Sequence, residues 1–392
     1  MNILVVTAMF PPIRTGTSFY SKNLSESLTR LGHNVTLVTL KNSEEPEDNY
    51  PFEVIRLKAI HLNVKNYFKH LRIASLFLSN YSALVKIIRE RDTDIILLVN
   101  HYLDIAFPVV YASKKTKIPF VVSVGTQMQS LNPFRNRILN MLDRLVPGKL
   151  VFPYCRNIIS WDREIHRYIE NVQSNKIVKK SVIIPFGVNG DPAVFAGYKH
   201  PYSVVSQILG VGAIIDQRDF LFNIRVFKEL LTFFPGLKLK IIGHVYNTAP
   251  VKLTTELGLE DKVEFLGEQP HNVVLDELQN STIHWMMLSG EYVGLGTSTI
   301  EAMQMGLPVI SNVPENLLGK SLLKDMENYV YTDSKDIENT VNKIKLVLDS
   351  ESLRQKIGLN GKKFVEENMN WNIVAEKYTE LFNTITGSFN NT

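Results

Sequence analysis

Short runs of apolar, β-branched residues recur along the chain, and each predicts a buried strand. Residues 2–8 form the first run and residues 34–40 the next. Between them, apolar side chains recur at helical spacing from about Ser18, and Gly32 lies where a helix commonly ends. A strand, a helix and a strand in this order predict a parallel sheet that helices cover on both faces. The same pattern predicts strands at 94–99, 118–124 and 157–160, and helices at 104–115 and 133–146.

A second set of the same elements follows a change in local residue composition near the middle of the chain. One last strand at 181–184 runs into a loop rich in Gly, Pro and Asn, which we interpret as the domain boundary. The predicted domains are residues 1–188 and 189–370, and a helix over 371–386 is expected to pack back onto the first domain. The fold class is therefore α/β, with two Rossmann-like, doubly wound domains in series. In the second domain the pattern predicts strands at 207–212, 237–243, 263–267, 284–288 and 307–311, and helices at 219–233 and 297–305.

The composition narrows the class of protein. A chain of 392 residues, 45% hydrophobic and 21% charged, is ordinary for a globular protein with two domains. The single cysteine, Cys155, excludes a disulfide framework, and the nine histidines show no pairing typical of a metal site. The first residues do not resemble a signal peptide, and no run is long enough to span a bilayer. We therefore expect a cytoplasmic protein without a metal or cofactor, and the net charge of +4 is too small to indicate nucleic acid.

The strongest candidate for chemistry is a glycine turn followed by a helix. Residues 294–296, Gly-Leu-Gly, precede a predicted helix start at Thr297, and free amides beside glycines suit a diphosphate. Glu301 lies one turn into this helix, where its carboxylate could accept both hydroxyls of a ribose. Ser298 and Glu301 also match a capping box, in which the glutamate only serves the helix end. This motif alone leaves both interpretations open, whereas a P-loop or a dinucleotide fingerprint is disfavoured because their residues are missing.

Two further loops follow predicted strands. The loop from Phe10 to Ser18 joins a strand to a helix, and Gly16 would let a substrate approach the backbone, although a plain connection explains it about as well. Arg218 follows the strand that ends at Gly212, and its guanidinium could reach phosphates. By default, an isolated arginine in a loop is a solvated surface residue.

Basic residues recur among apolar ones in two segments. One runs from Lys65 to Arg91, and the other from Phe134 to Arg144. Basic amphipathic helices can lie on an anionic membrane. More often, such residues form the solvated side of a packed helix, so both interpretations remain.

Taken in order, the motifs resemble those of the retaining glycosyltransferases of the glycogen-synthase-like, family-4 type. That family has the GT-B fold, in which two Rossmann-like domains face a central cleft. The resemblance extends over nearly the whole chain. It is carried by Phe10-Pro11-Pro12 with Gly16, Leu31 to Thr36, Ile183 to Asn189, Val211-Gly212 with Arg218, Gly294 to Ile310, and Asn370 to Ala375.

The resemblance implies that the C-terminal domain binds a nucleoside-diphosphate sugar and the N-terminal domain an acceptor. Arg218 and Glu301 are the catalytic candidates: Glu301 would hold the ribose, and Arg218 would stabilise the departing diphosphate. The family typically retains the anomeric configuration through leaving-group stabilisation and positioning, with no metal required. The donor-binding residues implied are Gly16, Gly212, Leu266, Gly294, Leu295, Gly296, Thr297 and Glu301.

Four positions depart from the family pattern. Ala213 replaces one of two phosphate-binding cations, and Val293 replaces a glutamate that would face the donor sugar. Gly125 replaces a histidine, and Thr15 replaces the first glycine of a pair. Glu291 is a candidate substitute near Val293, and the acceptor-side candidates near the other gaps are Arg14, Thr15, His101 and Gln127.

These observations predict a transferase that moves a sugar from a nucleoside-diphosphate sugar to a glycan or glycolipid acceptor with retention. We expect it to act in cell-surface polysaccharide or lipopolysaccharide biosynthesis, with a peripheral contact to the anionic inner face of the cell membrane. The main alternative is a catalytically impaired GT-B protein that binds a nucleotide, a glycan or a partner. The four departures from the family pattern favour this alternative. A third candidate is another reaction of the same fold, such as epimerisation of a nucleotide sugar.

Overall fold

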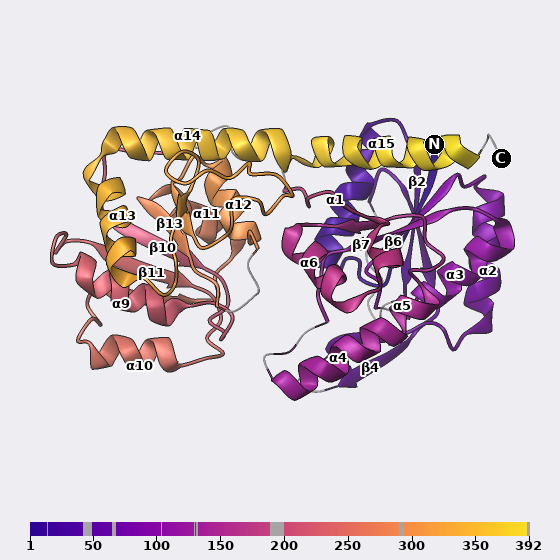
Figure 1. The fold of residues 1–392 in the computed structure, drawn as a ribbon, viewed down its shortest axis with the longest axis horizontal. Coiled ribbons are helices and arrows are strands. Elements are labelled where there is room, and N and C mark those ends of the chain that lie inside the picture. The colour runs from indigo at the N-terminus through magenta and orange to yellow at the C-terminus, as the bar shows by residue number, and fades with distance from the viewer. Residues whose placement is uncertain are drawn as a thin grey trace. The chain divides into compact units, whose positions relative to one another are not determined.

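The computed structural model divides the chain into two compact units, each built on a parallel sheet (Figure 1). Unit 1 comprises Met1–Asn189 and Trp371–Thr392, and unit 2 comprises Gly190–Asn370. The residues that the structure describes are 1–13, 15–41, 49–64, 68–102, 104–128, 130, 132–188, 200–289 and 294–389.

Unit 1 contains a seven-stranded sheet. Its strands are β1 (Asn2–Thr7), β2 (Asn34–Leu40), β3 (Glu53–Leu57), β6 (Ile95–Val99), β7 (Phe120–Val124), β8 (Ile158–Ser160) and β9 (Ser181–Ile183). They lie in the order β3-β2-β1-β6-β7-β8-β9, and every pairing is parallel. In β1, Ile3 pairs with Val35 on one side and with Ile95 on the other. The order reverses beside β1, and ligands of such sheets bind at the carboxyl ends of the strands near that reversal.

Helices cover both faces of this sheet because its strands carry apolar side chains on both sides. The helices are α1 (Gly16–Arg30), α2 (Leu78–Glu90), α3 (Ala106–Thr116), α4 (Pro133–Leu145), α5 (Pro147–Leu150), α6 (Arg163–Val172), α7 (Asn175–Val178) and α15 (Trp371–Phe389). Ile3 and Val5 pack in a core with α1 and α15, whereas Leu4 and Val6 pack in a core with α2, α3 and α6. The last helix of the chain therefore completes the hydrophobic core of unit 1.

A small antiparallel hairpin lies between β3 and α2. Its strands are β4 (Ile60–Val64) and β5 (Phe68–Ile73). Arg72 of β5 is buried, and its Nε donates to His61 on β4. The interpretation of Lys65 to Arg91 as basic amphipathic helix is therefore wrong over its first part, where strand pairing competes successfully with helix formation. Lys65 itself lies outside the described residues.

Unit 2 contains a six-stranded parallel sheet. Its strands are β10 (Gln207–Val211), β11 (Lys238–Ile242), β12 (Val263–Gly267), β13 (Ile283–Met286), β14 (Val309–Ser311) and β15 (Val330–Tyr331). Its helices are α9 (Phe220–Leu230), α10 (Ala249–Glu256), α11 (His271–Gln279), α12 (Thr297–Gln304), α13 (Ile337–Asp349) and α14 (Glu351–Asn368). The order β12-β11-β10-β13-β14-β15 reverses beside β10. The carboxyl ends of β10 and β13 thus form the switch point at which a ligand is expected.

The predicted fold class is confirmed, because both halves of the chain are parallel α/β sheets covered by helices. The predicted strand at 34–40 coincides with β2, and the predicted helix at 133–146 differs from α4 by one residue. The prediction missed β3, whose polar and apolar residues do not form a continuous buried run. Among the helices in the described ranges, none is long and apolar enough to cross a membrane.

Candidate functional site

The glycine turn of unit 2 leads into the start of α12, and among the described residues no side chain caps that start, where the cap residue is Gly296. Gly296 immediately precedes the helix, and both Gly296 and Thr297 are exposed. A β-carbon added at Gly296 would meet only Thr299 Oγ1, at 4.0 Å, so the space beside this turn is open. The first amides of a helix have no partner within the helix. An uncapped helix start beside open space suits a phosphate group.

Ser298 and Glu301 do not form a capping box. The Ser298 hydroxyl donates to the Val211 carbonyl at the end of β10, with an oxygen–oxygen distance of 3.0 Å. Glu301 Oε1 lies 3.1 Å from Nε2 of His271, the first residue of α11. The capping-box interpretation is therefore wrong, because neither side chain bonds to the amides at the helix start.

The Glu301 carboxylate is partly buried but still accessible to solvent. Its side chain is 21% exposed, whereas that of His271 is 65% exposed. Burial raises the pKa of Glu301, and the charge and hydrogen bond of His271 act in the opposite direction. An ionised carboxylate only accepts hydrogen bonds, and its two oxygens can take two neighbouring hydroxyls.

Arg218 packs against the end of β10 and is not a solvated surface residue. Its Nη1 donates to the Ala213 carbonyl at 3.2 Å. A β-carbon on Gly212 would lie 1.6 Å from this nitrogen, so only glycine leaves room for the guanidinium there. Gly212 also has a φ of +151°, which favours glycine. Burial lowers the pKa of Arg218, but a guanidinium keeps its charge even so.

Two contacts bring the donor-side candidates of unit 2 to one edge of its sheet. The Ser298–Val211 hydrogen bond holds the start of α12 beside Gly212. The Glu301–His271 contact holds the same helix beside the segment that follows β12. Gln269 of that segment donates to the carbonyl of Leu266 in β12. The side chain of Leu295 is buried, and Glu291 and Val293 lie outside the described residues. The candidates placed along this edge are Gly212, Arg218, Leu266, Gly294, Gly296, Thr297 and Glu301.

These groups provide a cation, an uncapped helix start and a carboxylate along one edge. Arg218 and the first amides of α12 favour negative charge, whereas Glu301 favours hydroxyl groups. The set matches a ligand that carries both phosphate and hydroxyls. In the part of the chain that the structure describes, no group of three His, Cys, Asp or Glu side chains is placed to hold a metal ion.

At the corresponding edge of unit 1, Thr15 has a structural role. Its hydroxyl accepts a hydrogen bond from the Ser18 amide at 3.2 Å and so caps α1. Gly16 begins that helix, and a β-carbon there would meet nothing within 4 Å. Thr17 Oγ1 accepts from Asn100 at the end of β6, at 2.8 Å. Arg14, an acceptor-side candidate, lies outside the described residues.

Trp161 occupies the place that a side chain at position 125 would take. A β-carbon on Gly125 would lie 2.2 Å from the Trp161 ring. No residue larger than glycine therefore fits at position 125 while the ring keeps this position. The indole stacks on Tyr20 with ring centroids 4.2 Å apart, and its Nε1 donates to Ser123 at 2.7 Å. Trp161 is not among the residues predicted for the site. Its position directly after the predicted strand at 157–160 is the feature that could have identified it.

The acceptor-side candidates His101 and Gln127 both contact other residues of unit 1. His101 is only 2% exposed, and its Nε2 lies 2.9 Å from Asp143 Oδ1 on α4. Burial alone would raise the pKa of Asp143, but His101 and the hydroxyl of Tyr168 outweigh it, so that this pKa is lowered. Gln127 donates to the Glu164 carbonyl at 3.2 Å. Both side chains are therefore engaged within unit 1.

Two family profiles match the two halves of the chain. "Glycosyltransferase Family 4" matches residues 14–191, and "Glycosyl transferases group 1" matches residues 206–364. The capsular polysaccharide biosynthesis glycosyltransferase CapM of Staphylococcus aureus is 27% identical over 181 residues, which are 44% of this chain and 45% of CapM. An uncharacterized glycosyltransferase of Haemophilus influenzae is 22% identical over 341 residues, covering 86% of this chain and 88% of that protein.

A solved structure shows the same fold over nearly the full length. HepE of Anabaena, in complex with UDP and glucose, superposes with a TM-score of 0.67 at 12% identity. The superposition covers 97% of this chain and 98% of HepE. The motifs, the two parallel sheets and the two family profiles thus lead to one assignment. The chain belongs to the family 4, group 1 glycosyltransferases, a family of retaining enzymes with the GT-B fold.

Proposed function

We propose that this protein transfers a sugar from a nucleoside-diphosphate sugar to a glycan or glycolipid acceptor, with retention, during assembly of a cell-surface polysaccharide at the inner face of the cell membrane. The observation that carries the proposal is the edge of unit 2, where Arg218, Glu301 and an uncapped helix start lie along one sheet. The role of CapM in capsular polysaccharide biosynthesis supports a polysaccharide product. The UDP and glucose in the HepE complex support a donor of this class.

Each group at this edge has a role in the proposed reaction. The amides at the start of α12 and the guanidinium of Arg218 hold the diphosphate, which becomes more negative as the bond to the sugar breaks. Stabilising that charge lowers the barrier to its departure. Glu301 accepts hydrogen bonds from the ribose hydroxyls and so fixes the nucleotide along the edge. The contact with His271 opposes the rise that burial causes in the pKa of Glu301.

Ala213 makes the phosphate-binding region of this chain less basic than its family resemblance implies. Loss of a cation that stabilises a leaving group typically costs about 2–4 kcal/mol of barrier. The burial of Arg218 against Gly212 offsets part of this loss, because a partly desolvated cation interacts more strongly than a solvated one. Arg218 then carries most of the side-chain contribution to leaving-group stabilisation.

A catalytically impaired GT-B protein that binds a nucleotide, a glycan or a partner is the second candidate function. Two observations favour it: Ala213 leaves one cation at the edge of unit 2, and Trp161 fills the place where the family has a histidine. Such a protein would still bind the nucleotide, because the groups for phosphate and ribose are present.

A panel of nucleoside-diphosphate sugars separates these candidates. The purified full chain is mixed with UDP-, GDP- and ADP-sugars and with lipid-linked and soluble glycan acceptors, and nucleotide release and product are followed. The proposed reaction gives release that depends on an acceptor and a product with retained configuration. Nucleotide binding without turnover across the panel supports the second candidate. Absence of nucleotide binding contradicts the proposed reaction and leaves only the glycan-binding or partner-binding form of the second candidate.

A further inference from the structure

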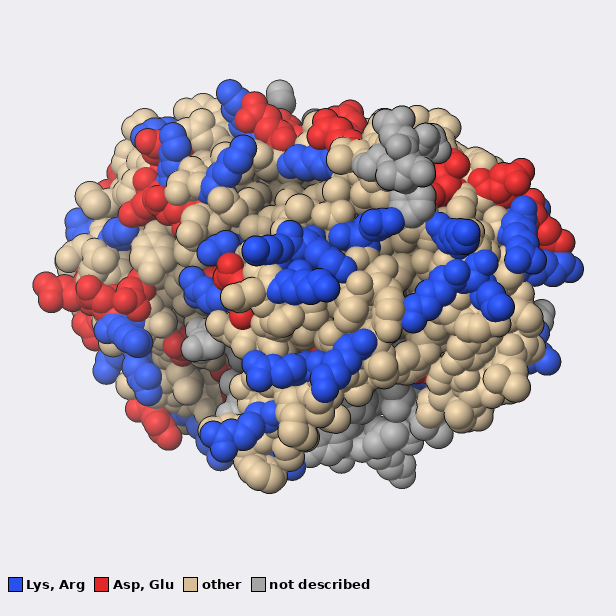
Figure 2. Space-filling view, turned by 45° about the vertical axis from the view of Figure 1, so that its right-hand side comes forward, with Lys and Arg blue, Asp and Glu red and all other residues tan. Residues whose placement is uncertain are grey.

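The positive charge of this chain is concentrated in one stretch of unit 1. Residues 105–161 contain eight lysines and arginines, whereas the net charge of the whole chain is only +4. Their one acid, Asp143, is buried against His101 and so adds no negative charge to the surface. In the view of Figure 2, which brings forward the side where Figure 1 shows unit 1, Lys and Arg side chains spread across the middle with few Asp or Glu between them. The basic residues of this stretch are Lys114, Lys115, Lys117, Arg135, Arg137, Arg144, Lys149 and Arg156.

Within this stretch, α4 exposes a stripe of large apolar side chains. Phe134 is 73% exposed and Met141 is 52% exposed, and Ile138 and Leu145 lie on the same face at helical spacing. A helix that packs only on its own domain would bury such residues. In α2, Leu84 and Ile87 are buried in the core of unit 1, and the exposed Leu78 lies only at the helix start.

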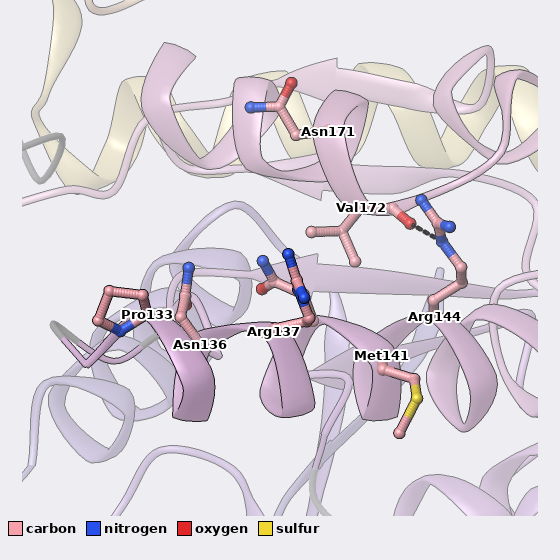
Figure 3. A pocket seen from close by; sticks show the side chains of 8 residues that line it. Pro133, Asn136, Arg137, Met141, Arg144, Asn171 and Val172 are labelled. Carbon is pink, nitrogen blue, oxygen red and sulfur yellow. Dashed lines mark hydrogen bonds between the residues drawn. The ribbon is translucent and has the colours of Figure 1, made fainter.

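A basic hollow lies beside this stripe on α4, and Met141 borders both. It has a volume of about 560 Å³ and is bordered on one side by α4 and on the other by the end of α6. Figure 3 shows Arg137 and Arg144 rising from α4 toward the segment that bears Asn171 and Val172. The Nε of Arg144 donates to the Val172 carbonyl at 2.9 Å, which fixes this arginine at the rim. Two guanidinium groups beside one hollow provide the paired donors that recognise a phosphate.

We propose that the α4 face docks on an anionic lipid bilayer, with the stripe in the acyl region and a lipid phosphate in the hollow between Arg137 and Arg144. Apolar side chains next to cations, with no exposed acid among them, are the features that attract a helix to an anionic interface. A second copy of this chain is disfavoured as the occupant, because pairing two such faces would bring like charges together. The inference rests on the membrane contact of the proposed function, but vesicle binding itself is measured without donor or acceptor.

Flotation of the full chain with vesicles tests the inference. One set of vesicles is phosphatidylcholine alone, and the other is an equal mixture of phosphatidylcholine and phosphatidylglycerol. The chain is expected to float with the mixed vesicles, to stay behind with the neutral ones, and to be released by salt. Equal binding to both sets, or binding to neither, contradicts the inference.

Charge variants locate the contact. Arg137→Gln with Arg144→Gln should weaken binding to the mixed vesicles by about thirtyfold, since each basic side chain near such a surface contributes about fivefold. The matched control is Arg225→Gln with Lys228→Gln, which removes the same charge from two exposed residues of α9 in unit 2. An equal loss in the control would show that only net charge matters and would overturn the assignment to α4. Thermal unfolding of each variant excludes misfolding as the cause.

Two further variants separate the hollow from the stripe. Arg137→Lys with Arg144→Lys keeps the charge but loses the paired donors, so it should weaken binding several-fold; unchanged binding contradicts the phosphate in the hollow. Phe134→Ser with Leu145→Ser, at two exposed residues of the stripe that do not line the hollow, should weaken vesicle binding while transfer to a soluble acceptor remains, which distinguishes this inference from the proposed reaction. Tight binding of soluble glycerol phosphate, or a dimer that the serine variant dissociates, would contradict the bilayer as the occupant.

Discussion

The carboxyl edges of the two sheets have the same architecture, but the chain uses their polar groups differently. In unit 2, the start of α12 has no side-chain cap, and the space beside Gly296 is open. In unit 1, Thr15 caps α1 and Trp161 covers Gly125. One edge therefore leaves its groups available to a ligand, whereas the other edge uses many of them to stabilise its own structure.

This difference explains two of the four departures from the family pattern. Thr15 takes the place of a glycine because a hydroxyl at that position can cap the following helix. Gly125 takes the place of a histidine together with Trp161, whose ring would collide with any side chain there. Both substitutions are changes in packing within unit 1. The availability of the unit 2 edge, by contrast, is what the proposed reaction depends on.

The largest effect is expected from Arg218→Ala at the open edge. This change removes the half-buried cation beside Gly212 and should lower kcat/KM by about 10²–10³-fold, since it acts on charge that develops in the transition state. Steady-state kinetics with the active donor measures it. Arg225→Ala, at an exposed position on α9, is the matched control and should leave kcat/KM unchanged. A loss below tenfold for Arg218→Ala would assign leaving-group stabilisation to other residues.

The next effect concerns Asp162, the cap of α6 in unit 1, which accepts from the Ile165 amide at 2.7 Å. Burial raises the pKa of Asp162 to about 6 from a model-compound value of 3.8. The folded state therefore binds more protons than the unfolded state between these values, so the free energy of unfolding should fall by about 2–3 kcal/mol as pH rises from 4 to 6. Asp162→Asn keeps a capping oxygen and should remove this fall in urea denaturation. If the free energy of unfolding had the same pH dependence in both proteins, Asp162 would not be the group responsible.

A double-mutant cycle tests the packing of Gly125 against Trp161. Gly125→Ala should destabilise the protein by about 1–3 kcal/mol, because the added β-carbon overlaps the indole. The same substitution in a Trp161→Ala background should cost little, so the two changes are strongly non-additive. Additive effects on the free energy of unfolding would mean that the ring does not occupy this place.

The smallest effect is expected from Gly296→Ala at the start of α12. The methyl group fits the protein, so the melting temperature should not change, but it would lie where a diphosphate approaches and should weaken nucleotide binding about tenfold. Gly236→Ala is the control, since a β-carbon there also meets nothing within 4 Å. Calorimetry and thermal unfolding measure both effects. Unchanged affinity would place the phosphate away from Gly296.

Much of the fold could be predicted because its buried parallel strands are continuous apolar runs, as in β1 and β2. The hairpin of β4 and β5 could not, since its basic and apolar residues also fit a helix. Ser298 contacts Val211 at the end of β10, and Glu301 contacts His271 at the start of α11. No local sequence pattern encodes these contacts between distant residues. The burial of His101 and the closure of Gly125 by Trp161 likewise arise from residues far apart in the sequence.

The central claim is that Glu301 holds the ribose hydroxyls of a nucleotide bound along the edge of unit 2. Calorimetry with UDP and with 2′,3′-dideoxy-UDP, on the native chain and on Glu301→Ala, tests it most directly. Hydrogen bonds to a charged group contribute about 1.5–3 kcal/mol each, so removal of the hydroxyls should weaken binding to the native chain by tenfold or more. The same removal should have no effect on Glu301→Ala. An equal loss for both proteins, or none for either, would contradict the role of Glu301.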